Sequence, residues 1–105
     1  MRPERNHVSK ESLILMGIPK HFCDKTLNDF NTKGKLGLIK VHDFIDEYLK
    51  DLNNNIEDNM GIFFFGSNGV GKSMLASIIL KEAYKKRYSG RRVTFSQYIR
   101  ISFFI

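Results

Sequence analysis

Residues 61–73 read GIFFFGSNGVGKS, in which an apolar, mostly aromatic run is followed by a glycine-rich segment and a lysine. The apolar run lacks alternating polar residues, which is typical of a strand buried on both faces of a parallel sheet. The segment after it fits the phosphate-binding pattern G-x-x-x-x-G-K-[ST], known as Walker A, with Gly66, Gly71, Lys72 and Ser73 at the defining positions. The stretch therefore predicts a strand, a phosphate-binding loop and a helix, in that order.

The residue types of this loop fit the chemistry of a nucleoside triphosphate bound with Mg²⁺. Glycines allow successive backbone N–H groups to turn towards a phosphate, and the start of the next helix adds its positive end. Lys72 is expected to reach the β and γ phosphates, and the Ser73 hydroxyl is expected to bind Mg²⁺. The predicted ATP-binding residues are Gly66, Ser67, Asn68, Gly69, Val70, Gly71, Lys72, Ser73 and Met74.

Amphipathic helices are predicted on both sides of the loop. Before it, apolar residues recur at three- and four-residue spacing through residues 38–52. These apolar residues are Leu38, Val41, Phe44, Ile45, Tyr48, Leu49 and Leu52. After the loop, a helix over residues 72–88 is expected to end at Ser89 and Gly90. Its predicted core face consists of Leu75, Ile78, Ile79 and Ala83.

The remaining segments complete the predicted organisation. Residues 93–95 are expected to form a second strand, and Ser96 is expected to cap a further helix that begins at Gln97. Residues 1–35 are expected to form a tail and an irregular linker that docks through Phe22, Leu27 and Phe30. The fold class predicted is α/β with parallel strands, in which residues 36–105 form a partial P-loop NTPase domain that stops after its second strand.

The charge distribution separates the two parts of the chain. Residues 1–60 carry nine Lys and Arg against ten Asp and Glu, a net charge of −1, and residues 61–105 carry eight against one, a net charge of +7. The basic half contains the glycine loop, which favours an anionic ligand or partner. Cys23 is the single cysteine, and no apolar stretch approaches the roughly 20 residues that span a bilayer. We therefore expect a cytoplasmic protein with no membrane segment.

Two other clusters have alternative interpretations. The basic cluster, formed by Lys85, Lys86, Arg87, Arg91 and Arg92, is expected either to bind single-stranded DNA or to form a solvated helix end. Asp46 and Glu47 resemble the acidic pair of an ATPase strand, but their apolar neighbours follow helical spacing. Both acids are therefore predicted to lie on the solvated face of a helix.

The segments GIPKHF at 17–22, GIFFFGSNGVGKS at 61–73 and RRVTFSQYI at 91–99 together resemble the DnaC/IstB-like branch of the AAA+ ATPases. This branch includes helicase loaders and transposase helpers, and the likeness covers roughly residues 17–99. It implies the N-terminal portion of an AAA+ three-layer sandwich with an ATP–Mg²⁺ site. It also implies a replicative helicase or another replication protein as the partner. Separately, the aromatic end ISFFI at 101–105 and a first strand without its sheet neighbours are expected to leave apolar surface exposed and to promote association into oligomers.

This chain departs from the family pattern in the catalytic parts. Family members carry an Asp-Glu pair on a later strand (Walker B), a sensor residue and an arginine finger, which have no counterparts in the sequence. The resemblance therefore implies that the chain binds ATP without hydrolysing it efficiently. Two other functions stay open: a non-catalytic module that binds nucleotide or a protein partner, and part of another P-loop enzyme such as a kinase.

Overall fold

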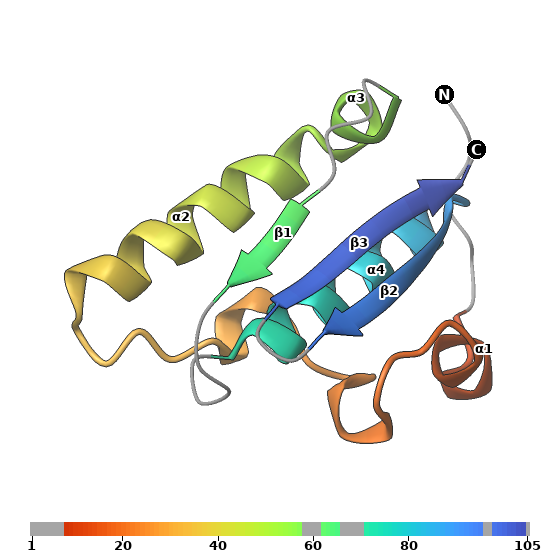
Figure 1. Cartoon of the computed structure of the whole chain (residues 1–105), viewed down its shortest axis with the longest axis horizontal. Helices are drawn as coiled ribbons and strands as arrows, with labels where there is room; N and C mark the ends of the chain where they lie inside the picture. The colour runs from red at the N-terminus through yellow and green to blue at the C-terminus, as the bar shows by residue number, and fades with distance from the viewer. Residues whose placement is uncertain (1–7, 58–61, 66–70, 96–97, 105) are drawn as a thin grey trace.

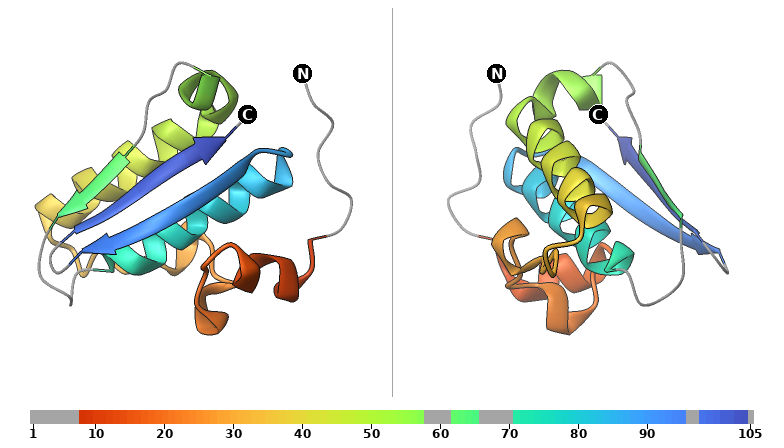
Figure 2. Two further views of the ribbon diagram at one scale, coloured as in Figure 1. Left: turned by 45° about the vertical axis from the view of Figure 1, so that its right-hand side comes forward. Right: turned by 90° about the vertical axis from the view of Figure 1, so that its left-hand side faces the viewer.

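The computed structural model describes residues 8–57, 62–65, 71–95 and 98–104, and in the strands it describes the backbone together with the side chain of Ile101. The elements are α1 (Lys10–Leu15), the 3-10 helices η1 (Lys20–Phe22) and η2 (Leu27–Asp29), α2 (Leu36–Lys50), α3 (Leu52–Glu57), β1 (Ile62–Phe65), α4 (Lys72–Lys85), β2 (Ser89–Phe95) and β3 (Tyr98–Phe104). Helix α4 contacts all three strands and also contacts α2 and η1 (Figures 1 and 2).

Helix α4 is the most deeply buried element of the described chain. The predicted core residues Leu75, Ile78, Ile79 and Ala83 are all buried, which confirms that part of the prediction. Ala76 and Leu80 are also fully excluded from solvent, so the helix is apolar around most of its circumference. A helix of that kind has to be covered on several sides. The buried Ser77 hydroxyl donates to the Ser73 carbonyl over 2.8 Å and so has a partner.

The segment before α2 packs against this same helix. Leu13, Ile18, Cys23 and Phe30 belong to one core cluster with the α4 residues, and Phe22 and Leu27 are half-buried against it. The predicted docking of the linker is therefore confirmed. The Lys81 ammonium on α4 also donates to the Lys25 carbonyl, and burial lowers the pKa of Lys81. Side chains and backbone thus both attach residues 13–30 to α4.

The end of α4 differs from the prediction. Arg87, with φ 68°, has left-handed backbone geometry directly after the helix cap at Lys86. The Arg87 N–H donates to the Tyr84 carbonyl and the Tyr88 N–H donates to the Ala83 carbonyl, each over 3.0 Å. This is the Schellman motif, which satisfies the last carbonyls of a helix. The helix therefore stops before the predicted Ser89 and Gly90, which instead begin β2.

The sheet corrects the predicted fold class. Its order is β1-β3-β2, and both pairings are antiparallel, with Ile62 opposite Ile101 and Phe95 opposite Tyr98. The fold is therefore not the predicted α/β P-loop sandwich with parallel strands. Only residues 96 and 97 separate β2 from β3. A parallel pair would need a crossover of about a dozen residues, whereas an antiparallel pair can be joined by two.

The helix predicted from Gln97 is also wrong, because residues 98–104 form β3. The sequence YIRISFF places Ile99, Ile101 and Phe103 at alternate positions, with Arg100 and Ser102 between them. Alternation with a period of two is typical of a strand, and this signal was available in the sequence. The predicted cap at Ser96 and the helix start at Gln97 lie outside the described residues.

The predicted amphipathic helix is confirmed in part. Residues 36–50 form α2, and a separate short helix, α3, begins at Leu52. Ile45, Tyr48 and Leu52 are buried as expected, whereas Val41 and Phe44 are exposed. The helical pattern therefore predicted the element correctly, but two of the apolar residues in that pattern do not join the core. Among all the described segments, no helix is long and apolar enough to cross a bilayer.

The burial of α4 predicts a large difference between two small substitutions. Ile79→Val removes one methylene from a fully buried site and should lower the free energy of unfolding by about 1 kcal/mol. Leu15→Ala removes more atoms, but from a side chain that is 88% exposed. It should change the free energy of unfolding by less than about 0.5 kcal/mol. Urea unfolding followed by circular dichroism measures both. A larger loss for Leu15→Ala would contradict this assignment of the core.

The left-handed residue at the end of α4 makes a second prediction. Arg87→Gly should be more stable than Arg87→Ala by roughly 1 kcal/mol, because glycine adopts positive φ without the steric cost that any Cβ brings. Both variants remove the arginine side chain, so the comparison isolates the backbone. Equal urea midpoints for the two variants would show that Arg87 is not held in this geometry in solution.

Candidate functional site

The candidate site lies where the chain enters α4. Strand β1 ends at Phe65 and α4 begins at Lys72, so a strand and a helix flank the glycine-rich segment as predicted. Gly66, Ser67, Asn68, Gly69 and Val70 lie outside the described residues. The other predicted residues, which are Gly71, Lys72, Ser73 and Met74, form the beginning of α4. The first N–H groups of any α-helix lack partners within the helix, so this end suits an anion.

Gly71 occupies a position that disfavours any other residue. Its φ of 76° is left-handed, and an added Cβ would lie 3.0 Å from Cε1 of Phe30. Its carbonyl accepts the first bond of the helix from the Leu75 N–H over 3.0 Å. Gly71 therefore has a structural role: it begins α4 and allows the Phe30 ring of the linker to pack against the backbone.

The next residues form a fixed first turn of α4. Lys72 is buried, with 6% of its surface exposed, and Ser73 is half-buried. The Ser73 carbonyl accepts from Ser77, and Met74 packs against the core cluster. A buried lysine is costly unless its ammonium is paired, so residues of this kind are usually found at sites that hold an anion or a carboxylate. The backbone of this turn is thus positioned by α4 itself.

A cavity of about 230 Å³ opens beside this turn. It is lined by Phe30, Asn31, Lys33, Lys35, Leu38, Gly71 and Met74. The lining combines two ammonium groups with an aromatic ring and aliphatic side chains, and it contains no acidic residue. Such a surface suits a ligand with an anionic part and a flat apolar part. The linker, the start of α2 and the start of α4 each contribute to it.

The site predicted from the sequence did not include Phe30, Lys33 or Lys35. Phe30 was predicted to dock the linker, and the two lysines have no distinguishing motif around them. They lie 36 to 41 positions before Gly71, and only the packing of the linker on α4 brings them there. A local sequence pattern gives no signal of that kind.

The predicted Mg²⁺ ligand remains a prediction. Within the described ranges, no group of three or more His, Cys, Asp or Glu side chains is arranged to hold a metal ion. In the P-loop pattern, however, Mg²⁺ is bound mainly by the nucleotide phosphates and one hydroxyl, so few protein side chains need to bind the ion. Ser73 is suitably placed in sequence, one residue after the lysine that begins α4.

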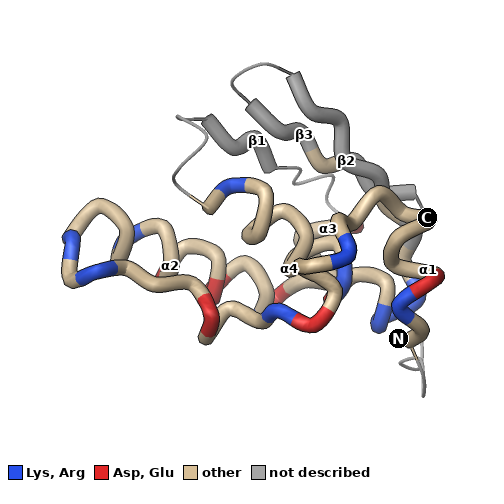
Figure 3. Tube along the Cα trace, turned by 90° about the horizontal axis from the view of Figure 1, so that it is seen from below, with Lys and Arg blue, Asp and Glu red and all other residues tan. Residues whose placement is uncertain are grey.

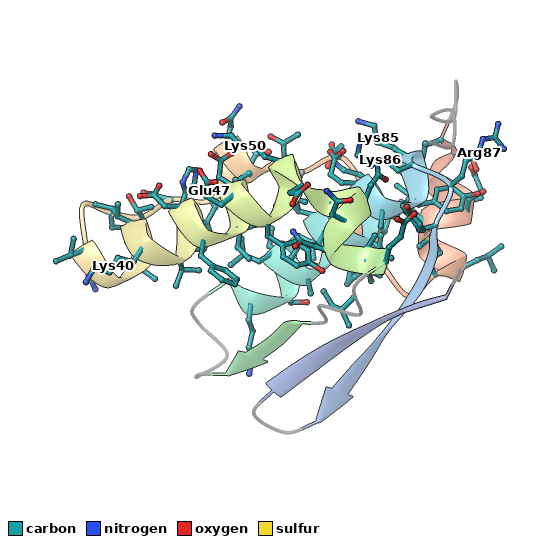
Figure 4. All side chains as sticks on the ribbon, turned by 90° about the horizontal axis from the view of Figure 1, so that it is seen from above. Lys40, Glu47, Lys50, Lys85, Lys86 and Arg87 are labelled. Carbon is teal, nitrogen blue, oxygen red and sulfur yellow. The ribbon has the colours of Figure 1, made fainter. Side chains whose placement is uncertain are left out.

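The structure places three of the five residues of the basic cluster together (Figure 4). Lys85, Lys86 and Arg87 lie together at the end of α4 (Figure 4), and Lys85 pairs with Glu82 over 3.4 Å. Arg91 and Arg92 belong to β2, and their side chains lie outside the described part of the chain. Binding of single-stranded DNA by this cluster remains a prediction. The ion pair with Glu82 and the position at a helix C-terminus are both typical of the alternative interpretation, a solvated helix end.

Comparison with known proteins gives no matching family model, no similar curated protein and no similar solved structure. The resemblance to the DnaC/IstB-like ATPases therefore rests on the sequence segments alone.

The geometry of Gly71 gives a prediction with a matched control. Gly71→Ala should lower the free energy of unfolding by roughly 1 to 2 kcal/mol, because it adds both backbone strain and a close contact with Phe30. Gly37→Ala, in helix α2 with open space around its Cα, should raise it by up to about 1 kcal/mol. Thermal and urea unfolding report both values. Stabilisation by Gly71→Ala would be incompatible with a left-handed residue 71.

Proposed function

We propose that this protein binds ATP with Mg²⁺ through residues 66–74. The observation that carries the proposal is the sequence G-x-x-x-x-G-K-S placed between β1 and the start of the 14-residue helix α4. The N-terminal end of that helix supplies backbone N–H groups and the positive end of the helix dipole for phosphate. Lys72 supplies the cation for the β and γ phosphates, and Ser73 supplies a hydroxyl for Mg²⁺.

The cavity beside Gly71 supports a nucleotide rather than a free phosphate. Lys33 and Lys35 add positive charge next to the start of α4, while Phe30 and Leu38 provide apolar surface. A base or ribose extending from phosphates at the start of α4 would reach this cavity, because Gly71 is the N-cap of α4 and also lines the cavity. Since the sheet is antiparallel, the proposal concerns the local strand–loop–helix unit and does not depend on the fold of a P-loop NTPase.

The proposed activity is binding rather than efficient hydrolysis. Phosphoryl transfer to water needs a carboxylate-organised metal, a positioned water and a cation for the transition state. Glu82 is the only acid in the sequence after Asp58. It lies ten residues into α4, about 15 Å along the helix axis from Lys72, where it pairs with Lys85. It is therefore a poor candidate for the acid that activates water.

The cellular setting follows from the resemblance and from the ligand. A helicase loader or transposase helper works on DNA in the cytoplasm, where ATP and Mg²⁺ are abundant and a single cysteine stays reduced. A replicative helicase or another replication protein is the corresponding partner. The second candidate function is a non-catalytic module that binds nucleotide in order to present a protein surface. It is favoured by the distance of Glu82 from the start of α4.

Isothermal titration with ATP and Mg²⁺ tests the proposed site. Lys72→Met keeps the apolar stem of the side chain but removes the charge, and it should weaken ATP binding at least tenfold, or about 1.4 kcal/mol. Ser73→Ala should weaken binding only when Mg²⁺ is present. Lys86→Met, at the far end of α4, is the matched control and should bind like the wild type.

Circular dichroism establishes that each variant is folded before it is titrated. Equal affinities for the wild type and a folded Lys72→Met variant would exclude the proposed phosphate site. Absence of ATP binding by the folded wild type would exclude the proposed function as a whole.

A further inference from the structure

Helix α2 carries apolar side chains that the rest of the described chain leaves uncovered. Leu36, Val41 and Phe44 are 67%, 39% and 60% exposed. Ile45 and Tyr48 on the same helix are buried, so α2 packs on the core with one face. Val41 lies one turn before Ile45 on that face, whereas Leu36 and Phe44 lie on a different side of the helix. The helix runs along one edge of the molecule, where a partner could approach it (Figure 1). We call the face formed by residues 36, 40, 44 and 47, which recur at three- and four-residue spacing, the outer face of α2.

Charge is divided along the same helix. Residues 33–42 contain Lys33, Lys35 and Lys40 and no acid, whereas residues 43–51 contain four acids and only one lysine. Figure 3 shows the lysines at one end of α2 and the carboxylates farther along it. Two such helices placed antiparallel would bring the basic half of each against the acidic half of the other. Two placed parallel would bring like charges together.

One charged pair on the outer face fits this arrangement directly. Lys40 and Glu47 are seven residues apart, which is about two helical turns, so helical spacing places both residues on one side of α2. Lys40 makes no ion pair with any residue in the described part of the chain. Glu47 is 3.8 Å from Lys50 at an exposed position, and a pair of that kind is weak. Both charges are therefore available to a partner.

We propose that a second copy of this chain docks on the outer face of α2, with the two helices antiparallel about a twofold axis. The midpoint between residues 40 and 47 falls between Asp43 and Phe44. The Phe44 side chains of the two copies therefore meet on one side of the axis, and the Asp43 side chains, each 3.2 Å from its own His42 Nδ1, lie on the other side. Lys40 then lies opposite the partner's Glu47, and the twofold symmetry makes this ion pair twice. The antiparallel order also opposes the two helix dipoles favourably.

The expected dimer is weak and depends on concentration. Helix α2 has 15 residues, a length of about 22 Å, so contact along this helix alone gives a small interface of the transient class. Exposed ion pairs add modest affinity but favour one orientation strongly, because the alternatives place like charges together. The outer face of α2 adjoins the proposed nucleotide cavity at Lys33 and Lys35. Its central residues Lys40, Phe44 and Glu47 do not line that cavity, so the contact between copies does not require bound ATP.

Sedimentation equilibrium of the full chain over a range of concentrations tests the proposal. The wild type should show a monomer–dimer equilibrium. Lys40→Glu and Glu47→Lys should each weaken self-association at least tenfold, because each replaces two attractive pairs by two repulsive ones. An equimolar mixture of these two variants should associate again, because every introduced charge then meets an opposite charge on the other chain.

Matched controls carry the same charge changes at exposed positions outside α2. Lys20→Glu and Glu11→Lys should self-associate like the wild type. Phe44→Ser should weaken association without changing the pairing of charges. A wild type that stays monomeric at all concentrations would overturn the proposal. So would single charge reversals that associate like the wild type, or a mixture of the two folded variants that stays monomeric.

Discussion

The burial of α4 is the constraint on which the other elements depend. Ala76, Ile79, Leu80 and Ala83 form one fully buried face, and Leu75, Ser77 and Ile78 extend the buried surface around most of its middle turns. A single sheet or a single helix covers only one side of such a helix, so both are needed. The three strands contact it from one direction, and α2 and η1 contact it from another (Figure 2). The linker completes the cover through Ile18, Cys23 and Phe30.

This packing also determines what the start of α4 can do. A helix that is held along its whole length has a rigid first turn, so the groups at its N-terminal end are positioned in advance for an anion. Phe30 packs against Gly71 and places the linker lysines beside that turn. The elements that stabilise the core therefore also assemble the cavity next to the candidate phosphate site. Stability and the proposed binding function depend on the same contacts.

Helix α2 has two apolar faces, and the core covers only one of them. Ile45, Tyr48 and Leu52 join the cluster around α4, while Phe44 and Leu36 remain in solvent. The division of charge along α2 adds nothing to the packing of the monomer, because its acids pair only locally with Lys50 and His42 among the described residues. An antiparallel contact between two copies gives both features a physical role.

The sequence by itself determined the local elements: the helical periods of α2 and α4, the strand before the glycine segment, and the phosphate-binding pattern between them. Those features depend on neighbouring residues, so they can be read from spacing. Only the tertiary structure decided the direction of the strands, the exposure of Phe44 and the approach of Phe30, Lys33 and Lys35 to Gly71. These depend on which distant segments share the surface of α4. A periodic pattern shows that a residue is apolar, but not which other segment covers it.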